Sequence, residues 1–118
     1  MFATLVDVND ALELLDLAAS GVAMCASSPL SDTELHTAVI GVQRHIDRLK
    51  IIHAGLLHQA DQRRMWAGTG YRDVADWLAG TTNTSRGDAN SRARLGAALE
   101  ASETLRKAAE DGDVSAAT

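Results

Sequence analysis

The stretch "SDTELHTAVIGVQRHIDRLKIIHAGLLHQADQRRMWAG", residues 31–68, decides the fold of this chain. It begins with Ser31 and Glu34 at the spacing of a capping box, in which each side chain accepts a hydrogen bond from the backbone N–H of the other residue. Apolar residues then alternate at spacings of four and three, which is the heptad pattern of a long helix. The pattern predicts one helix over about residues 31–67, ending near Trp66 with Gly68 as its C-cap.

The heptad stripe of this helix is the set of apolar residues Leu35, Val39, Val42, Ile46, Leu49 and Leu56. His53 and Ala60 continue the same register, and we expect His53 to be a hydrogen-bonded core histidine. An apolar stripe of this length needs a partner surface. Two partners are open: another helix of the same chain, which would make the stripe core, or a second copy, which would make a homodimer.

Upstream of this helix, residues 9–26 repeat apolar positions at helical spacing, within a first segment of residues 1–28. Leu14 and Leu17 widen the apolar face, so this segment suits a core helix better than a narrow two-helix seam. The "SSPL" segment, with the only proline of the chain, separates the two helices.

Downstream, the sequence predicts a helix-turn-helix-like region over residues 72–109 and a tail over residues 110–118. A short helix at about residues 72–81 is followed by "TNTS" and by a helix that starts at Ser85 and continues to about residue 109. The expected fold is therefore all-α, a helical bundle built on one long helix, with residues 1–118 as a single domain.

The corner at residues 79–88 fits a helix-turn-helix turn. Ala79 is the small residue inside the first helix, and Asn83 falls where the turn needs a left-handed residue. Ser85 is expected to cap the second helix, with Asp88 completing the box. Arg92 interrupts the apolar side of this helix, and we expect Asp88 to hold it.

Three polar residues of the second helix, Arg86, Asn90 and Arg94, lie along one strip at a spacing of four. Arginine matches guanine edges and phosphates, and asparagine matches adenine edges, so this strip is the candidate nucleic-acid-binding site. The alternative interpretation is a solvated face of a packed helix.

Charge and composition limit the other function classes. The net charge is -5, although residues 59–99 carry six basic and four acidic residues. The single cysteine, Cys25, excludes an internal disulfide and fits a cytoplasmic protein, and no apolar run is long enough to cross a membrane. The four histidines lack a metal-ligand spacing, and no nucleophile–base pair, paired carboxylates or phosphate loop appears. We therefore expect no enzyme activity, no metal, no cofactor and no small-molecule substrate.

Ordered landmarks over about residues 30–118 resemble the actinobacterial domain-of-unknown-function family 222. These landmarks are the long helix followed by Trp66 and Gly70, the Trp77-Leu78-Ala79 segment, a turn, and a helix rich in arginine and alanine. The resemblance implies a helical domain that accompanies an HNH endonuclease module in phage-related and prophage-related proteins. This chain departs from the family pattern because "TNTS" replaces a Gly-Leu turn and because no histidine lies in the C-terminal half. We therefore expect a truncated family member without the nuclease.

The sequence thus favours a non-catalytic helical accessory domain that contacts DNA through Arg86, Asn90 and Arg94. The alternative is an assembly module that uses the heptad stripe to form a homodimer or bind a partner protein, with no DNA binding.

Overall fold

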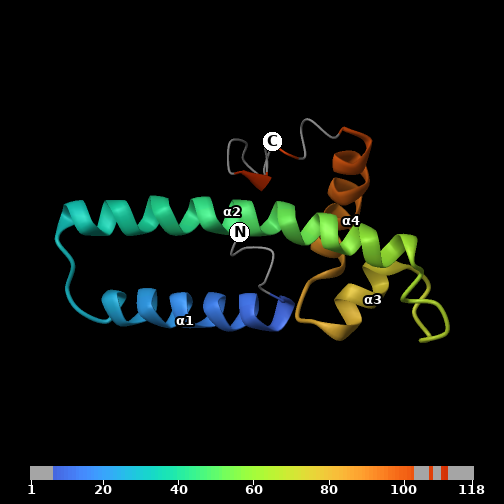
Figure 1. Ribbon diagram of the computed structural model, residues 1–118, viewed down its shortest axis with the longest axis horizontal. Helices are drawn as coiled ribbons and strands as arrows, with labels where there is room; N and C mark the ends of the chain where they lie inside the picture. Colours follow the sequence, from blue (N-terminus) through green and yellow to red (C-terminus); the bar gives the residue numbers. More distant parts are fainter. Residues whose placement is uncertain (1–6, 103–106, 108–109, 112–118) are drawn as a thin grey trace. The chain divides into compact units, whose positions relative to one another are not determined.

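The computed structural model describes residues 7–102, 107, 110 and 111. These residues form four helices and no strand, so the all-α expectation is confirmed (Figure 1). The helices are α1 (Val8–Ala26), α2 (Asp32–Gln62), α3 (Val74–Thr81) and α4 (Arg86–Ala101). They belong to two compact units, residues 1–38 and residues 39–118, and α2 continues from the first unit into the second.

In the first unit, α1 begins where Asp7 caps it, with the Asp7 carboxylate accepting from the backbone N–H of Asp10 at 2.8 Å. The expectation that α1 is a core helix is not met, because none of its residues is buried. Leu17 and Met24 are at least 70 % exposed, and Cys25 is exposed as well.

The beginning of α2 follows the predicted capping box. The Ser31 N–H donates to Glu34 Oε1 at 3.0 Å, and the Glu34 N–H donates to Ser31 Oγ at 3.1 Å. The hydrogen bonds with Ser31 hold the pKa of Glu34 below its ordinary value. The start of this helix could therefore be predicted from two residues.

The end of α2 corrects the prediction, because the helix stops at Gln62 and not near Trp66. The Met65 N–H donates to the Ala60 carbonyl at 3.0 Å and the Arg64 N–H donates to the Asp61 carbonyl at 2.9 Å, the paired hydrogen bonds of a Schellman cap. Arg64, with φ 51, takes the left-handed position that glycine usually occupies.

Contacts with the Trp66 side chain compensate for this backbone conformation. The Arg64 guanidinium lies 4.8 Å from the Trp66 ring centroid, a cation–π contact worth about 0.5–1 kcal/mol at an exposed site. The Trp66 Nε1–H donates to Asp61 Oδ1 at 3.0 Å. Gly68, the expected cap, has φ 78 but lies in the turns that follow the helix.

The second unit buries a core between the C-terminal half of α2, α3 and α4 (Figure 1). Two adjoining clusters make up this core: Leu57, Val74, Ala75, Leu78 and Ala89, and Ile51, Ala54 and Leu99. Ile51, Ala54 and Leu57 are the buried residues of α2, and none of them belongs to the heptad stripe. At 3.6 residues per turn, they are centred about 100° around the helix from that stripe.

The contact between α2 and α4 depends on Gly96. A Cβ atom at this position would collide with the backbone carbonyl oxygen of Ala54 and would lie 3.1 Å from His58 Cβ. Because a backbone carbonyl cannot rotate away as a side chain can, α4 approaches α2 this closely only with glycine at position 96. Ala54 is fully buried at this contact.

The boundaries of α3 and α4 differ from the prediction at two ends, the beginning of α3 and the end of α4. Helix α3 begins at Val74, because Asp73 caps it by accepting from the Asp76 N–H at 2.8 Å. Helix α4 begins after Ser85 as expected, with Ser85 Oγ accepting from the Asp88 N–H at 3.1 Å. It ends at Ala101, before residue 109, and residues 103–106, 108–109 and 112–118 lie outside the described part of the chain.

A side-chain contact also joins α2 to α4. Arg92 Nη1 lies 2.8 Å from His53 Nδ1, and because a guanidinium only donates, Nδ1 is the acceptor and His53 is neutral. Burial, and then the charge of Arg92, lower the pKa of His53. The expected hydrogen bond of His53 agrees with this contact, but His53 is only half-buried and is not a core residue. The expected Asp88–Arg92 pairing is replaced by the contact of Arg92 with His53.

Replacing Gly96 with alanine tests the close approach of α4 to α2. We expect Gly96→Ala to lower the free energy of unfolding by about 1–3 kcal/mol, as overpacked cores do, despite the better helix propensity of alanine. The control is Gly87→Ala in the first turn of α4, where an added Cβ meets nothing within 4 Å. This control should be neutral or stabilising by up to about 1 kcal/mol in urea unfolding. Equal effects at both positions would contradict the close approach.

The His53–Arg92 contact predicts a pH dependence of stability. Because the folded-state pKa of His53 lies below 6.5, its contribution to stability is complete above pH 6.5 and is lost as the pH falls through the folded pKa. We expect His53→Asn, which keeps an acceptor near the Nδ1 position, to reduce the loss of unfolding free energy below pH 6.5. His45→Asn, at an exposed position of α2, is the control and should leave that loss unchanged. An unchanged pH profile in His53→Asn would show that this histidine does not couple to folding.

Candidate functional site

Threonine hydroxyl groups build the corner between α3 and α4. Thr82 has an extended backbone, and its hydroxyl donates to the Leu78 carbonyl at 2.7 Å. The Thr84 hydroxyl lies 2.8 Å from the Thr82 hydroxyl, and the Thr84 N–H donates to Thr82 Oγ1 at 3.3 Å. The expectation of a left-handed Asn83 is therefore wrong: Arg64 is the only non-glycine residue with positive φ in the part of the chain that the structure describes.

The first residue of the predicted strip, Arg86, is engaged within the corner. Its Nη2 lies 2.6 Å from Asp76 Oδ1, and the other oxygen of Asp76 accepts from the Arg72 N–H at 3.2 Å. Asp76 therefore connects the beginning of α4 to the beginning of α3. The Arg86 side chain is exposed, and an ion pair near the surface contributes about 0–1 kcal/mol. The pair engages the guanidinium that the sequence analysis assigned to nucleic acid.

The other two strip residues, Asn90 and Arg94, are exposed on α4. Arg94 Nη2 donates to Ser91 Oγ at 3.3 Å, a long hydrogen bond that leaves the other guanidinium N–H groups for a ligand. The three strip residues thus lie on one helix. The Arg86 guanidinium is paired with Asp76, whereas Asn90 and Arg94 are exposed.

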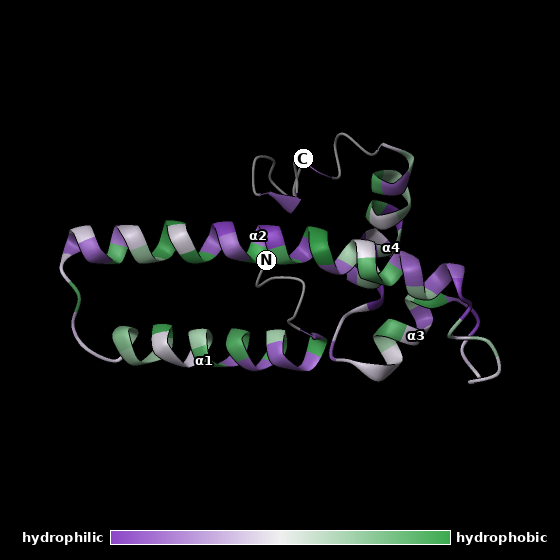
Figure 2. Cartoon of the chain, viewed as in Figure 1, coloured by the Kyte–Doolittle hydropathy of each residue, from purple (hydrophilic) through white to green (hydrophobic). Residues whose placement is uncertain are grey.

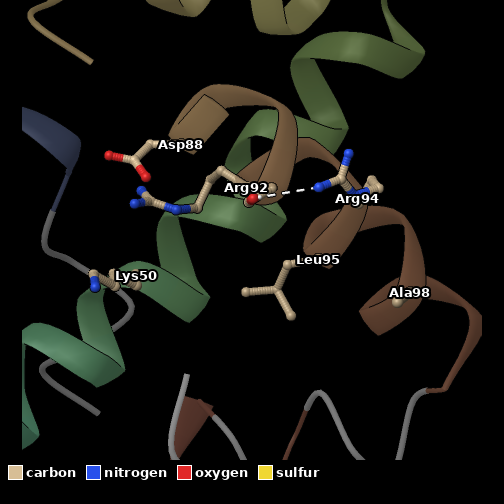
Figure 3. Close-up of a pocket in the computed structure, with 7 residues that line it drawn as sticks. Lys50, Asp88, Arg92, Arg94, Leu95 and Ala98 are labelled. Carbon is tan, nitrogen blue, oxygen red and sulfur yellow. Dashed lines mark hydrogen bonds between the residues drawn. The ribbon is translucent and has the colours of Figure 1, made fainter. Parts of the chain in front are cut away.

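A hollow between α2 and α4, which sequence reasoning missed, contains other charged residues (Figure 3). Its volume is ≈ 490 Å³, and we call it the α2–α4 hollow. It is lined by Lys50, Asp88, Ser91, Arg92, Arg94, Leu95 and Ala98. Of these, only Arg94 belongs to the predicted strip. The sequence carried no signal for Lys50, because this residue joins α4 only through the way the two helices cross.

The heptad stripe is an apolar feature of α2 that is not buried. Its six apolar residues are between 40 % and 58 % exposed: Leu35, Val39, Val42, Ile46, Leu49 and Leu56. Figure 2 shows hydrophobic residues recurring along the length of this helix. The core formed with α3 and α4 uses a different face of α2, so the stripe is not part of that core.

The described residues contain no group of three or more His, Cys, Asp or Glu side chains that could hold a metal ion. Within the same residues, no helix is long and apolar enough to cross a membrane. Comparisons with protein families, with curated proteins and with solved structures find no match for this chain.

Proposed function

We propose that this chain is a non-catalytic helical assembly module in which α2 pairs with α2 of a second copy through the heptad stripe. The single observation that carries the proposal is the exposure of the stripe. Its residues from Val39 to Leu56 remain at least 40 % exposed although α2 also contributes a buried face to the core of the second unit. Exposed apolar residues that are contiguous on one surface are typical of interaction sites.

The residue types in the stripe favour a second copy as its occupant. In heptad notation, Val39 and Ile46 occupy successive a positions, and the d positions are leucine at residues 35, 49 and 56 and valine at residue 42. β-Branched residues at a with leucine at most d positions favour parallel two-stranded coiled coils. His53 falls at the next a position and is a polar residue there, with its Nδ1 hydrogen-bonded to Arg92 of α4. A polar a position of this kind fixes register at some cost in stability.

A second candidate function is nucleic-acid contact through α4, and the exposure of Asn90 and Arg94 favours it. The resemblance to the nuclease-associated family 222 points in the same direction and stays a prediction, as does a cytoplasmic location. The ion pair of Arg86 with Asp76 and the net charge of -5 count against it. We therefore rank it below assembly.

Two isoleucines of α2 provide a matched test of the assembly proposal. Ile46 and Ile40 are both 41 % exposed, but only Ile46 lies on the stripe. We expect the full-length protein to sediment as a dimer, Ile46→Asp to sediment as a monomer with unchanged helical circular dichroism, and Ile40→Asp to remain a dimer. The physical reason is that a charge in an apolar seam must be desolvated, whereas a charge outside it stays in water.

A monomeric parent protein, or equal loss of the dimer in both isoleucine variants, would contradict pairing through the stripe. Loss of the helical signal in Ile46→Asp would contradict it too, because it would make the stripe part of the folded core.

The second candidate predicts that duplex DNA binds at low salt and dissociates steeply as salt is added, since counterions are released when phosphates are contacted. Arg94→Ala should weaken binding, and Arg86→Ala should weaken it less, because the Arg86 guanidinium is already paired with Asp76. Arg44→Ala, at an exposed position of α2, is the control for the loss of one charge. Fluorescence anisotropy with labelled duplex measures all four proteins. Absence of binding at low salt removes this candidate.

A further inference from the structure

The α2–α4 hollow concentrates positive charge in a chain that is acidic overall. Lys50 of α2 and Arg92 and Arg94 of α4 line it, and Asp88 is the only carboxylate among the lining residues that the structure describes. In the view of Figure 3, the charged ends of Lys50, Asp88 and Arg92 lie toward one end of the hollow, with Arg94 toward the other. Its formal charge is therefore positive, while the whole chain carries -5.

The hydrogen-bonding groups of the hollow are mostly donors. One nitrogen of Arg92 is held by His53 Nδ1, which fixes the guanidinium and leaves its remaining N–H groups as donors. The Ser91 hydroxyl accepts from Arg94, so its own proton can be donated to a ligand. Fixed arginine donors beside a lysine and a serine hydroxyl match an anion with several oxygen acceptors.

We propose that the α2–α4 hollow binds a phosphate group. Lys50 and Arg92 at one end of the hollow favour a multiply charged anion there, and Arg94 adds positive charge at the other end. The volume of ≈ 490 Å³ lies within the range of about 300–1,000 Å³ found for ligand pockets. The half-buried Leu95 gives the hollow an apolar wall against which an organic group attached to the phosphate can pack. The phosphate can belong to a small compound or to a nucleic-acid backbone, because the recognising chemistry is the same.

This site does not depend on the pairing of α2 through the heptad stripe, since its lining residues come from one chain. It shares Arg94 with the predicted α4 strip, but Lys50 and Arg92 line the hollow and are not strip residues. Variants at Lys50 therefore test the hollow without testing the strip.

Titration of the full-length, ¹⁵N-labelled protein with sodium pyrophosphate, at constant ionic strength, tests the proposal. We expect saturable shifts of the backbone amide signals around Lys50 and Ser91–Leu95. Lys50→Ala should weaken binding about three- to tenfold, because it removes a charge-assisted contact. Asp88→Asn should strengthen binding, because it removes the carboxylate that repels the anion. Arg44→Ala, which removes one charge from an exposed position of α2 outside the hollow, should leave the affinity unchanged.

Opposite changes in Lys50→Ala and Asp88→Asn support the site. Absence of saturable shifts overturns the site. Equal weakening by Lys50→Ala and Arg44→Ala overturns it too, because the affinity would then depend only on the net charge of the protein. Arg86→Ala should bind pyrophosphate as the parent does, and a loss there would assign the anion to the strip and overturn the hollow.

A labelled single-stranded oligonucleotide distinguishes the two sources of the phosphate. Oligonucleotide binding that pyrophosphate displaces, and that Lys50→Ala weakens, supports the hollow with a nucleic-acid backbone as its ligand. Pyrophosphate binding without oligonucleotide binding supports it with a small phosphate compound.

Discussion

The close approach of Gly96 to the Ala54 carbonyl decides which face of α2 becomes core. Only a residue without a side chain fits between the two helices at this point, so α4 is held against the face that carries Ile51, Ala54 and Leu57. The heptad stripe lies outside this face, and its six apolar residues are between 40 % and 58 % exposed. The same approach brings Arg92 within hydrogen-bonding distance of His53 and brings Lys50 beside α4. One glycine thus positions the core and the hollow.

The parts of the fold that depend on neighbouring residues were predictable from the sequence. The capping box of Ser31 and Glu34 and the cap of Ser85 are local hydrogen bonds, so each follows from residues three apart. The helix periods are equally local, which is why four helices were expected where four are described. Asp73 follows the same rule as Ser85, and its cap could have been recognised from Asp76 three residues later.

Interactions between more distant residues account for the parts that were not predictable. Residue propensity favoured Asn83 for a left-handed turn. In the structure the Thr82 hydroxyl donates to the Leu78 carbonyl of α3 while the Thr82 backbone is extended. Arg64 was an unlikely residue for a left-handed helix end, and the Trp66 ring helps to hold it there. The ion pair of Arg86 could not be predicted for the same reason. Its partner Asp76 is ten residues away and comes close to Arg86 only through the corner between α3 and α4. The role of Gly96 could not be predicted from its neighbours in the sequence, because a glycine inside a helix indicates only a low helix propensity.

The two proposed surfaces of α2 are neighbours on one helix, and this geometry bears on how they combine. Lys50 directly follows the stripe residue Leu49, so it occupies an e position, which flanks the seam of a coiled coil. In a parallel pair the two-fold axis places the two e positions on opposite sides of the seam. The described lining residues of each hollow would then come from one chain. A dimer would therefore carry two anion sites, neither of which needs residues of the other chain. The proposed phosphate site and the proposed dimer can thus be tested separately. Two identical basic sites on one assembly would also bind a polyanion more tightly than either alone wherever its spacing lets both engage.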